Sequence, residues 1–189
     1  MHRFFVAPGS IDDEGVTFTG EVAGRLERVL RMRPGDQIVV LDDSGWEYLV
    51  SLDRVTAQQV HGRVTQRLLS KGEPQTRITL FQAILKASRF ELVLQKGTEL
   101  GVSAFVPFYC ERSVPRDSGR GRPDGRHERW QRIIKEAAEQ SRRGKLPVLS
   151  APVDFATNVP CLSRHSDLVF NAVVVRLQFL IPKWPIFDR

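Results

Sequence analysis

The sequence predicts an α/β protein in which a small N-terminal β-barrel is followed by a parallel sheet with helices. Up to about Leu69, short β-like runs alternate with turn signals such as Pro34-Gly35-Asp36, a pattern typical of small barrels. Strand-like and helix-like segments then alternate, which indicates a parallel sheet. The chain has 189 residues, of which 41% are hydrophobic. It is therefore long and apolar enough for one sizeable domain or two small ones.

The first part of the chain is expected to contain five strands and one helix. We place the helix at about Glu21 to Met32, with Val22, Leu26 and Val29 on its apolar face, because these residues recur at three- and four-residue spacing. Residues 70–74 place a Gly and a Pro among polar residues, so we expect a linker there. The five expected strands are Arg3 to Ala7, Val16 to Thr19, Gln37 to Leu41, Trp46 to Leu52 and Gln59 to Leu68.

Basic residues are concentrated in two regions. Lys and Arg number 28 against 22 Asp and Glu, a net charge of +6, which favours a polyanionic partner. Arg25, Arg28 and Arg31 follow at three-residue intervals and so share a helix face opposite the apolar one. Residues 112–145 add eleven Lys or Arg against five Asp or Glu. A solvated basic face is the alternative, but two localised patches, one of them loop-rich, favour nucleic acid.

The second part is expected to alternate strand, helix, strand and helix. Ser88 precedes Glu91 by three residues, so the hydroxyl and the carboxylate can each satisfy a backbone N–H at the start of a helix. Gly101 and Gly144 are expected to end the two helices in the left-handed conformation. The expected elements are Arg77 to Leu85, Ser88 to Leu100, Ala104 to Tyr109 and about Asp124 to Arg142, with a last strand within Asp167 to Val175.

A charged pair follows the buried strand that is expected to end at Tyr109. Ligands gather at the carboxyl ends of strands in open α/β sheets, so Glu111 and Arg112 are candidate site residues. The alternative is a solvated ion pair at a loop entrance. The basic stretch after this pair, VPRDSGRGRP, is expected to be a loop that can contact a substrate.

Several other kinds of site and location are not indicated. Cys110 and Cys161 lie far apart without CxxC or Cys/His spacing, so we expect no disulfide, no metal and a reduced, cytoplasmic compartment. The N-terminus lacks the apolar stretch of a signal peptide, and no uncharged run is long enough to span a membrane. Walker, GxGxxG, GxSxG and HExxH patterns do not occur, which argues against the corresponding enzyme classes.

Six motifs in order resemble the bacterial small-subunit ribosomal RNA methyltransferases of type E. These enzymes methylate a uridine at ring nitrogen N3 with S-adenosylmethionine, and the resemblance runs from about residue 3 to residue 155. The motifs are RFFV at Arg3 to Val6, RVLRMRPGD at Arg28 to Asp36, the strand start at Gly45 to Tyr48, ELVLQKGTELGV at Glu91 to Val102, ERSV at Glu111 to Val114 and ERWQRIIKEAAEQSRR at Glu128 to Arg143.

The resemblance implies a fold, partners and site residues. It implies a PUA-like β-barrel over residues 1–70 that binds RNA, and a SPOUT domain over 75–189 with a trefoil knot, within a homodimer that takes part in ribosomal RNA processing. Glu111 or Glu139 would orient or deprotonate the uracil, and Arg112 would stabilise the resulting anion. The RNA-binding residues would be Arg3, Arg25, Arg28, Arg31, Lys86, Arg116, Arg120 and Arg122.

The C-terminal segment departs from the family pattern. Family members continue with GPEGG and LGxRILRxETA segments that form the knot and hold the methyl donor, whereas the last glycine of this chain is Gly144. We therefore expect an atypical tail over residues 156–189 and an incomplete knot, and no donor-binding residue is assigned. Two interpretations follow. One is an S-adenosylmethionine-dependent enzyme, and the other is a catalytically inactive RNA-binding remnant that lacks the donor pocket.

Overall fold

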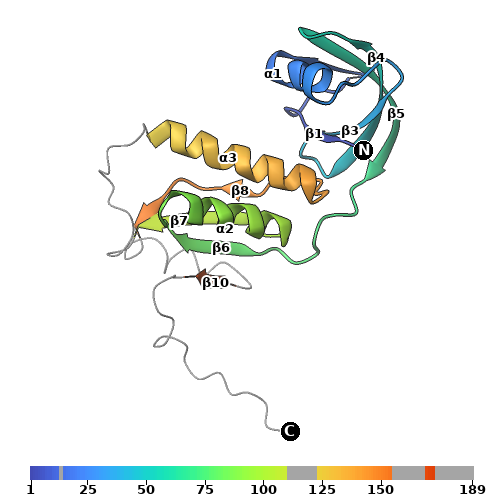
Figure 1. Cartoon of the computed structure of the whole chain (residues 1–189). Coiled ribbons are helices and arrows are strands. Elements are labelled where there is room, and N and C mark those ends of the chain that lie inside the picture. The colour runs from blue at the N-terminus through green and yellow to red at the C-terminus, as the bar shows by residue number, and fades with distance from the viewer. Residues whose placement is uncertain (13–14, 110–122, 155–168, 173–189) are drawn as a thin grey trace.

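The computed structural model describes residues 1–12, 15–109, 123–154 and 169–172. Figure 1 shows two lobes, each built on its own sheet and joined by a single connecting stretch. The N-terminal lobe comprises residues 1–69, the C-terminal lobe begins at Thr79, and residues 70–78 form the connecting stretch between them.

The N-terminal lobe is a curled five-stranded sheet. The strand order is β1-β3-β4-β5-β2, with β1 parallel to β3 and the remaining neighbours antiparallel. Phe4, Phe18 and Val50 are buried between the curled sheet and its helix. All five predicted strands are confirmed, while closure into a PUA-like barrel stays a prediction. The strands are β1 (Arg3–Phe5), β2 (Val16–Thr19), β3 (Gln37–Leu41), β4 (Trp46–Val55) and β5 (Gln59–Leu69).

The predicted helix of this lobe is shorter than expected and irregular. It consists of α1 (Gly20–Gly24) and a π-helical turn, η1 (Arg25–Val29), in which Leu30 N–H donates to the carbonyl of Arg25. The wider π turn adds a residue to the spacing, so Val29 is 71% exposed and does not lie on the apolar face. Arg31 then takes a left-handed conformation with φ 55°. The prediction of one regular helix to Met32 was therefore wrong.

The C-terminal lobe has a parallel sheet covered on one face by two helices (Figure 1). The strand order is β10-β6-β7-β8, and β9 also pairs with β7. Every pair is parallel, which confirms the prediction from strand and helix alternation. The elements are β6 (Thr79–Ala83), α2 (Ala87–Glu99), β7 (Ala104–Tyr109), α3 (Pro123–Gln140), β8 (Val148–Leu149), β9 (Val153–Asp154) and β10 (Val169–Ala172).

The two ends of α2 differ in how well they were predicted. Gly101 has φ 95°, and Val102 N–H donates to the carbonyl of Gly97, so a left-handed glycine ends the helix as expected. The predicted start at Ser88 was wrong. Lys86 is the extended residue before the helix, and no side chain caps its first turn. Ser88 lies within that turn because Arg89 N–H already bonds the carbonyl of Lys86.

The end of α3 was also predicted at the wrong residue. Arg142, with φ 61°, takes the left-handed position that was assigned to Gly144, and Arg143 N–H donates to the carbonyl of Ala138. Gly144 is required for a different reason. A Cβ at this position would lie 2.3 Å from the Cβ of Ser70. The absence of a side chain at Gly144 therefore lets the segment after α3 lie close to the connecting stretch.

The core of the C-terminal lobe lies between the sheet and its two helices. Phe90 of α2 and Trp130 of α3 have ring centroids 4.5 Å apart. Beneath them, Phe105 of β7 is fully buried, and a Cβ on Gly97 would come within 2.7 Å of its ring. The absence of a side chain at Gly97 therefore lets α2 lie close to the sheet.

Candidate functional site

An apolar seam joins the two lobes where the C-terminal end of α3 meets β1 (Figure 1). Phe5, Val39 and Leu41 from the N-terminal lobe form one buried cluster with Ala138 of α3, and Leu146 packs against this cluster. The seam excludes water from the backbone around Phe5. It therefore places any polar group within it in a medium where unpaired atoms are costly.

Glu139, a predicted catalytic residue, lies in this seam. Its side chain is only 7% exposed, its Oε1 atom accepts a hydrogen bond from the backbone N–H of Phe5 at 3.1 Å, and its Oε2 atom is 3.8 Å from Arg25 Nη1. Burial raises the pKa of Glu139 above its ordinary value, against the opposing effects of the Phe5 N–H, Lys135 and Arg25. The carboxyl group therefore holds its proton more readily than an exposed glutamate does.

Of the predicted RNA-binding arginines of the N-terminal lobe, Arg25 and Arg28 lie within η1, whereas Arg31 follows it. The Arg25 guanidinium lies between Glu139 and the Phe4 ring, 5.5 Å from the ring centroid. Arg28 is exposed, and its guanidinium folds back over Gly24. Arg31 is exposed on the left-handed residue that follows the turn. The structure therefore does not bring the three together on one helix face.

The other predicted RNA-binding residues occupy different surroundings. Arg3 forms a two-pronged ion pair with Glu47, with N–O distances of 2.6 and 3.1 Å, and only 11% of its side chain is exposed. Lys86 is exposed at the start of α2. The remaining candidates lie outside the described residues, as do both members of the charged pair after β7. These are Arg116, Arg120 and Arg122 for RNA, and Glu111 and Arg112 for catalysis.

A cleft of about 550 Å³ opens along the seam. Sequence reasoning missed two of its cations, Arg132 and Lys135, although their spacing of three residues on α3 was a usable signal. With all groups ionised, the positive and negative charges that line the cleft balance. The charged residues that line the cleft are Arg25, Arg132, Lys135, Glu21, Glu136 and Glu139.

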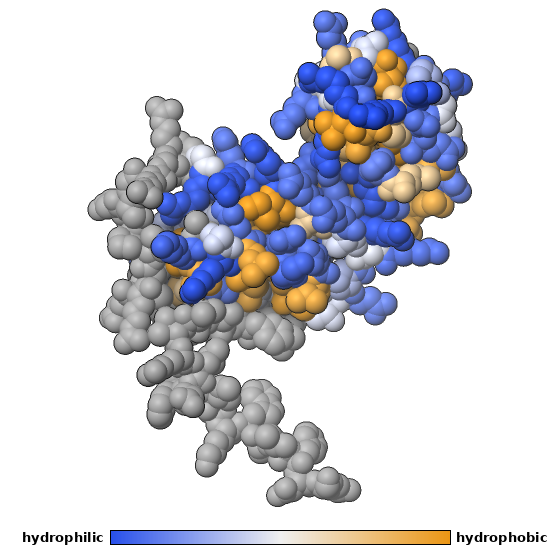
Figure 2. Space-filling view, viewed as in Figure 1, coloured by the Kyte–Doolittle hydropathy of each residue, from blue (hydrophilic) through white to orange (hydrophobic). Residues whose placement is uncertain are grey.

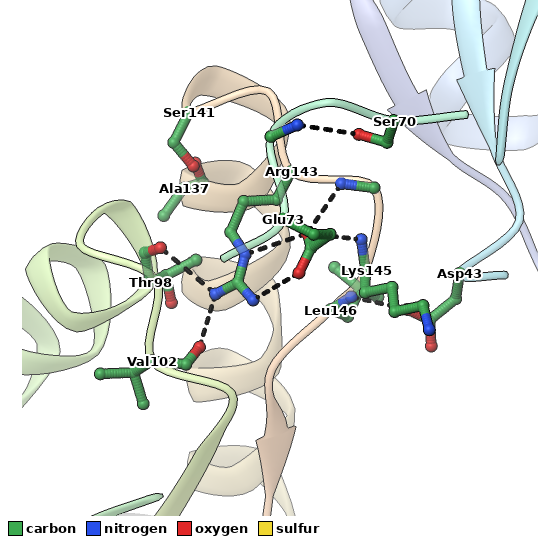
Figure 3. A network of polar contacts seen from close by, with 12 residues as sticks. Asp43, Ser70, Glu73, Thr98, Val102, Ala137, Ser141, Arg143, Lys145 and Leu146 are labelled. Atoms are coloured by element: carbon green, nitrogen blue, oxygen red, sulfur yellow. Dashed lines mark hydrogen bonds and ion pairs between the residues drawn. The ribbon is translucent and has the colours of Figure 1, made fainter. Parts of the chain in front are cut away.

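A network of polar contacts holds the connecting stretch against the C-terminal lobe (Figure 3). The Arg143 guanidinium donates to Glu73 at 2.9 and 3.2 Å and to the backbone carbonyls of Thr98 and Val102. Burial by itself raises the pKa of Glu73, but the hydrogen bonds from Arg143 and from the backbone N–H of Lys145 outweigh it and lower the pKa. Glu73 is therefore held as a carboxylate.

The described residues show neither a metal site nor a membrane helix. Among them, no group of three or more His, Cys, Asp or Glu side chains is arranged to hold a metal ion. Likewise, none of the helices in the described ranges is long and apolar enough to cross a membrane. On the face shown in Figure 2, hydrophilic side chains surround separate hydrophobic groups. That surface suits a polar or charged partner better than an extended apolar one.

The raised pKa of Glu139 predicts how stability depends on pH. The folded protein keeps this proton to a higher pH than the unfolded chain, so rising pH favours unfolding just above the ordinary Glu pKa. Glu139→Gln removes this titrating group. The free energy of unfolding of the variant, relative to that of the wild type, is therefore expected to increase as pH rises across that range. Urea unfolding at a series of pH values measures the difference. A difference that is constant with pH, or falls as pH rises, would contradict the prediction. The control is Glu128→Gln, at an exposed position near the start of the same helix.

Comparison with known proteins gives consistent matches. A family model described as an RNA methyltransferase domain matches residues 71–175. Ribosomal RNA small subunit methyltransferase E of Synechocystis is 37% identical over 174 residues, which are 91% of this chain and 54% of that protein. The protein of the same name from Bacillus subtilis is 35% identical over 150 residues, 78% of this chain and 58% of that protein. The chain thus spans little more than half the length of these relatives.

Solved structures give the same result. A ribosomal RNA small subunit methyltransferase E from Neisseria gonorrhoeae, bound to S-adenosylmethionine, matches with a TM-score of 0.73 and 29% identity over 82% of this chain and 62% of that one. The structure of a methyltransferase from Legionella pneumophila, also in complex with S-adenosylmethionine, matches with a TM-score of 0.72 and 32% identity. The match covers 80% of this chain and 62% of that one. The family match extends to residue 175, whereas the motifs named from the sequence end before residue 155.

Proposed function

Because this chain belongs to the family defined by the RNA methyltransferase domain, we propose that it transfers a methyl group from S-adenosylmethionine to small-subunit ribosomal RNA. The observation that carries the proposal is the match of residues 71–175 to that family. It is supported by two similar structures that were solved with S-adenosylmethionine. The finer proposals are uridine N3 as the acceptor, a PUA-like barrel over residues 1–70, a SPOUT domain over 75–189, a homodimer and a cytoplasmic location.

The donor site is proposed at the carboxyl edge of the parallel sheet, where α/β proteins gather ligands. β7 and β10 both end next to residues outside the described ranges, so no described residue is assigned to the donor, and the incomplete knot stays a prediction. S-adenosylmethionine would supply an electrophilic methyl group. For the acceptor, a neutral imide is a poor nucleophile, so we propose that Glu111 removes the uracil N3 proton and Arg112 stabilises the anion.

RNA binding is proposed for a set of exposed cations on both lobes. In the described part of the chain the candidates are Arg28, Arg31 and Lys86, together with Arg132 at the cleft. Arg3 and Arg25 are less suited to binding phosphate because Glu47 and Glu139 already pair with them. Arg116, Arg120 and Arg122 remain part of the proposal. These cations favour a second candidate function, RNA binding without methyl transfer, because binding needs no donor site.

The test is transfer of radiolabelled methyl from S-adenosylmethionine to an unmodified transcript of small-subunit ribosomal RNA and to small ribosomal subunits. We expect label in the small-subunit substrates and 3-methyluridine after nuclease digestion and mass spectrometry, with large-subunit RNA as the unlabelled control. Calorimetry with the donor alone is run in parallel. Salt-sensitive RNA binding without donor binding or transfer would replace the proposal with the second candidate. A protein that neither binds RNA nor transfers methyl would overturn both candidate functions.

A further inference from the structure

The backbone of β1 needs a partner that its own sheet does not supply. Among the strands that the structure describes, β1 lies at an edge of its sheet and pairs with β3 alone. On the side facing β3, the N–H of Val6 donates to the backbone carbonyl of Leu41, and the N–H of Val39 donates to the backbone carbonyl of His2. Backbone groups alternate in direction along a strand, so the N–H of Phe5 points to the outer side of the sheet. There it is enclosed by the apolar seam, where an unpaired donor is costly.

Glu139 supplies that partner from the other lobe. Its Oε1 atom accepts a hydrogen bond from the Phe5 N–H at 3.1 Å. In a wider sheet, the carbonyl of a neighbouring strand would accept this bond. Its Oε2 atom faces Arg25 on η1, and the same guanidinium lies over the ring of Phe4. One side chain near the end of α3 thus contacts both the edge strand and the helical turn of the N-terminal lobe. Each carboxylate oxygen already has a partner within the protein.

We propose that Glu139 is a positioning residue, which fixes the N-terminal lobe against α3 so that RNA held on that lobe meets the methyl-transfer site at a set orientation. This inference rests on the proposed function for its kinetic part and replaces the prediction that Glu139 orients or deprotonates the uracil. A general base must reach the proton that it removes. Glu139 instead directs one oxygen to a backbone amide and the other to an internal cation.

Two substitutions separate positioning from proton transfer because they are expected to rank in opposite orders. Glu139→Gln keeps an oxygen acceptor at the same reach but cannot act as a base. Glu139→Asp keeps the charge and the basicity but withdraws the carboxylate by one methylene from the Phe5 N–H. Glu136→Gln is the matched control, since Glu136 is an exposed carboxylate on the same helix that lines the same cleft.

The first readout is amide hydrogen exchange at Phe5, measured by NMR, which needs no activity. The Asp variant is expected to raise the exchange rate about tenfold or more, because a hydrogen bond of ordinary strength is lost. The Gln variant and the Glu136→Gln control are expected to stay within about threefold of the wild type. Equal exchange in all four proteins, or faster exchange in Gln than in Asp, would overturn the proposal.

The second readout is kinetics with the RNA substrate. A positioning role predicts that Glu139→Gln keeps kcat/KM within about fivefold of the wild-type value. Glu139→Asp is expected to lower kcat/KM further, mainly by raising KM for RNA. A catalytic base predicts the reverse, with a loss of about 10²- to 10⁴-fold in kcat for Gln. That reverse order would overturn the positioning role. If the wild type transfers no methyl, the proposed function fails, while amide exchange at Phe5 still decides whether Glu139 joins the lobes.

Discussion

Arg143→Ala is expected to lower the free energy of unfolding by about 3–5 kcal/mol, the cost of breaking a buried ion pair on one side. The Arg143 side chain is 4% exposed and reaches two segments that are far from it in the sequence. It pairs with Glu73 on the connecting stretch and donates to the carbonyls of Thr98 and Val102 at the end of α2 (Figure 3). The alanine variant leaves a partly buried carboxylate and two carbonyls without this donor. Urea unfolding measures the change.

Two further variants identify the cause of that loss. Arg143→Lys keeps the charge but cannot reproduce the planar fork that serves Glu73 and both carbonyls, so we expect an intermediate loss. Lys96→Ala removes an exposed ion pair to Glu99 on α2 and should change stability by no more than about 1 kcal/mol. If Arg143→Ala cost no more than Lys96→Ala, the network would not support the fold as described.

Phe105→Ala is expected to cost about 3–5 kcal/mol, the range for removing a fully buried aromatic ring. The ring belongs to β7, is fully buried and packs against Gly97 of α2. Its removal leaves a cavity under the helix, and the helix cannot fill the cavity without moving away from Trp130 and the rest of the cluster. Thermal and urea unfolding should both register the loss, with secondary structure retained at low temperature.

The control for Phe105 is a large apolar residue on the surface. Leu100, at the end of α2, is 81% exposed, so Leu100→Ala should change stability by no more than about 0.5 kcal/mol. A similar loss in both variants would mean that burial does not set the cost. A loss below about 1 kcal/mol for Phe105→Ala would contradict the packing described for the C-terminal lobe.

Elements with strong local signals were predictable to the residue. The strands Val16–Thr19, Gln37–Leu41 and Ala104–Tyr109 were predicted with the bounds that the structure gives them. Turn residues flank the first two on both sides, and the third is a short, almost wholly apolar run after the helix-ending Gly101. Gly101 was also assigned correctly as a left-handed helix end. In each case the deciding interactions lie within a few residues of the chain.

Helix ends that depend on distant contacts were predicted wrongly. Gly144 looked like a helix-ending glycine, but it is needed for its approach to Ser70, and Arg142 takes the left-handed conformation instead. The spacing of Val29 in the sequence fits the apolar face of a regular helix, but the π-helical turn places this residue at the solvent-exposed surface. A sequence pattern records spacing and residue type, and it does not contain the neighbour that makes one choice better than another.

By itself, the sequence determined the fold class, the alternation that makes the second sheet parallel, and the motifs that match an RNA methyltransferase domain. Only the tertiary structure decided what the charged residues do. Glu139 and Phe5 are 134 residues apart in the chain, and Glu73 and Arg143 are 70 apart. The pairing of buried charges depends on which groups remain without water once the lobes have packed, and that packing is set by the whole fold rather than by local sequence.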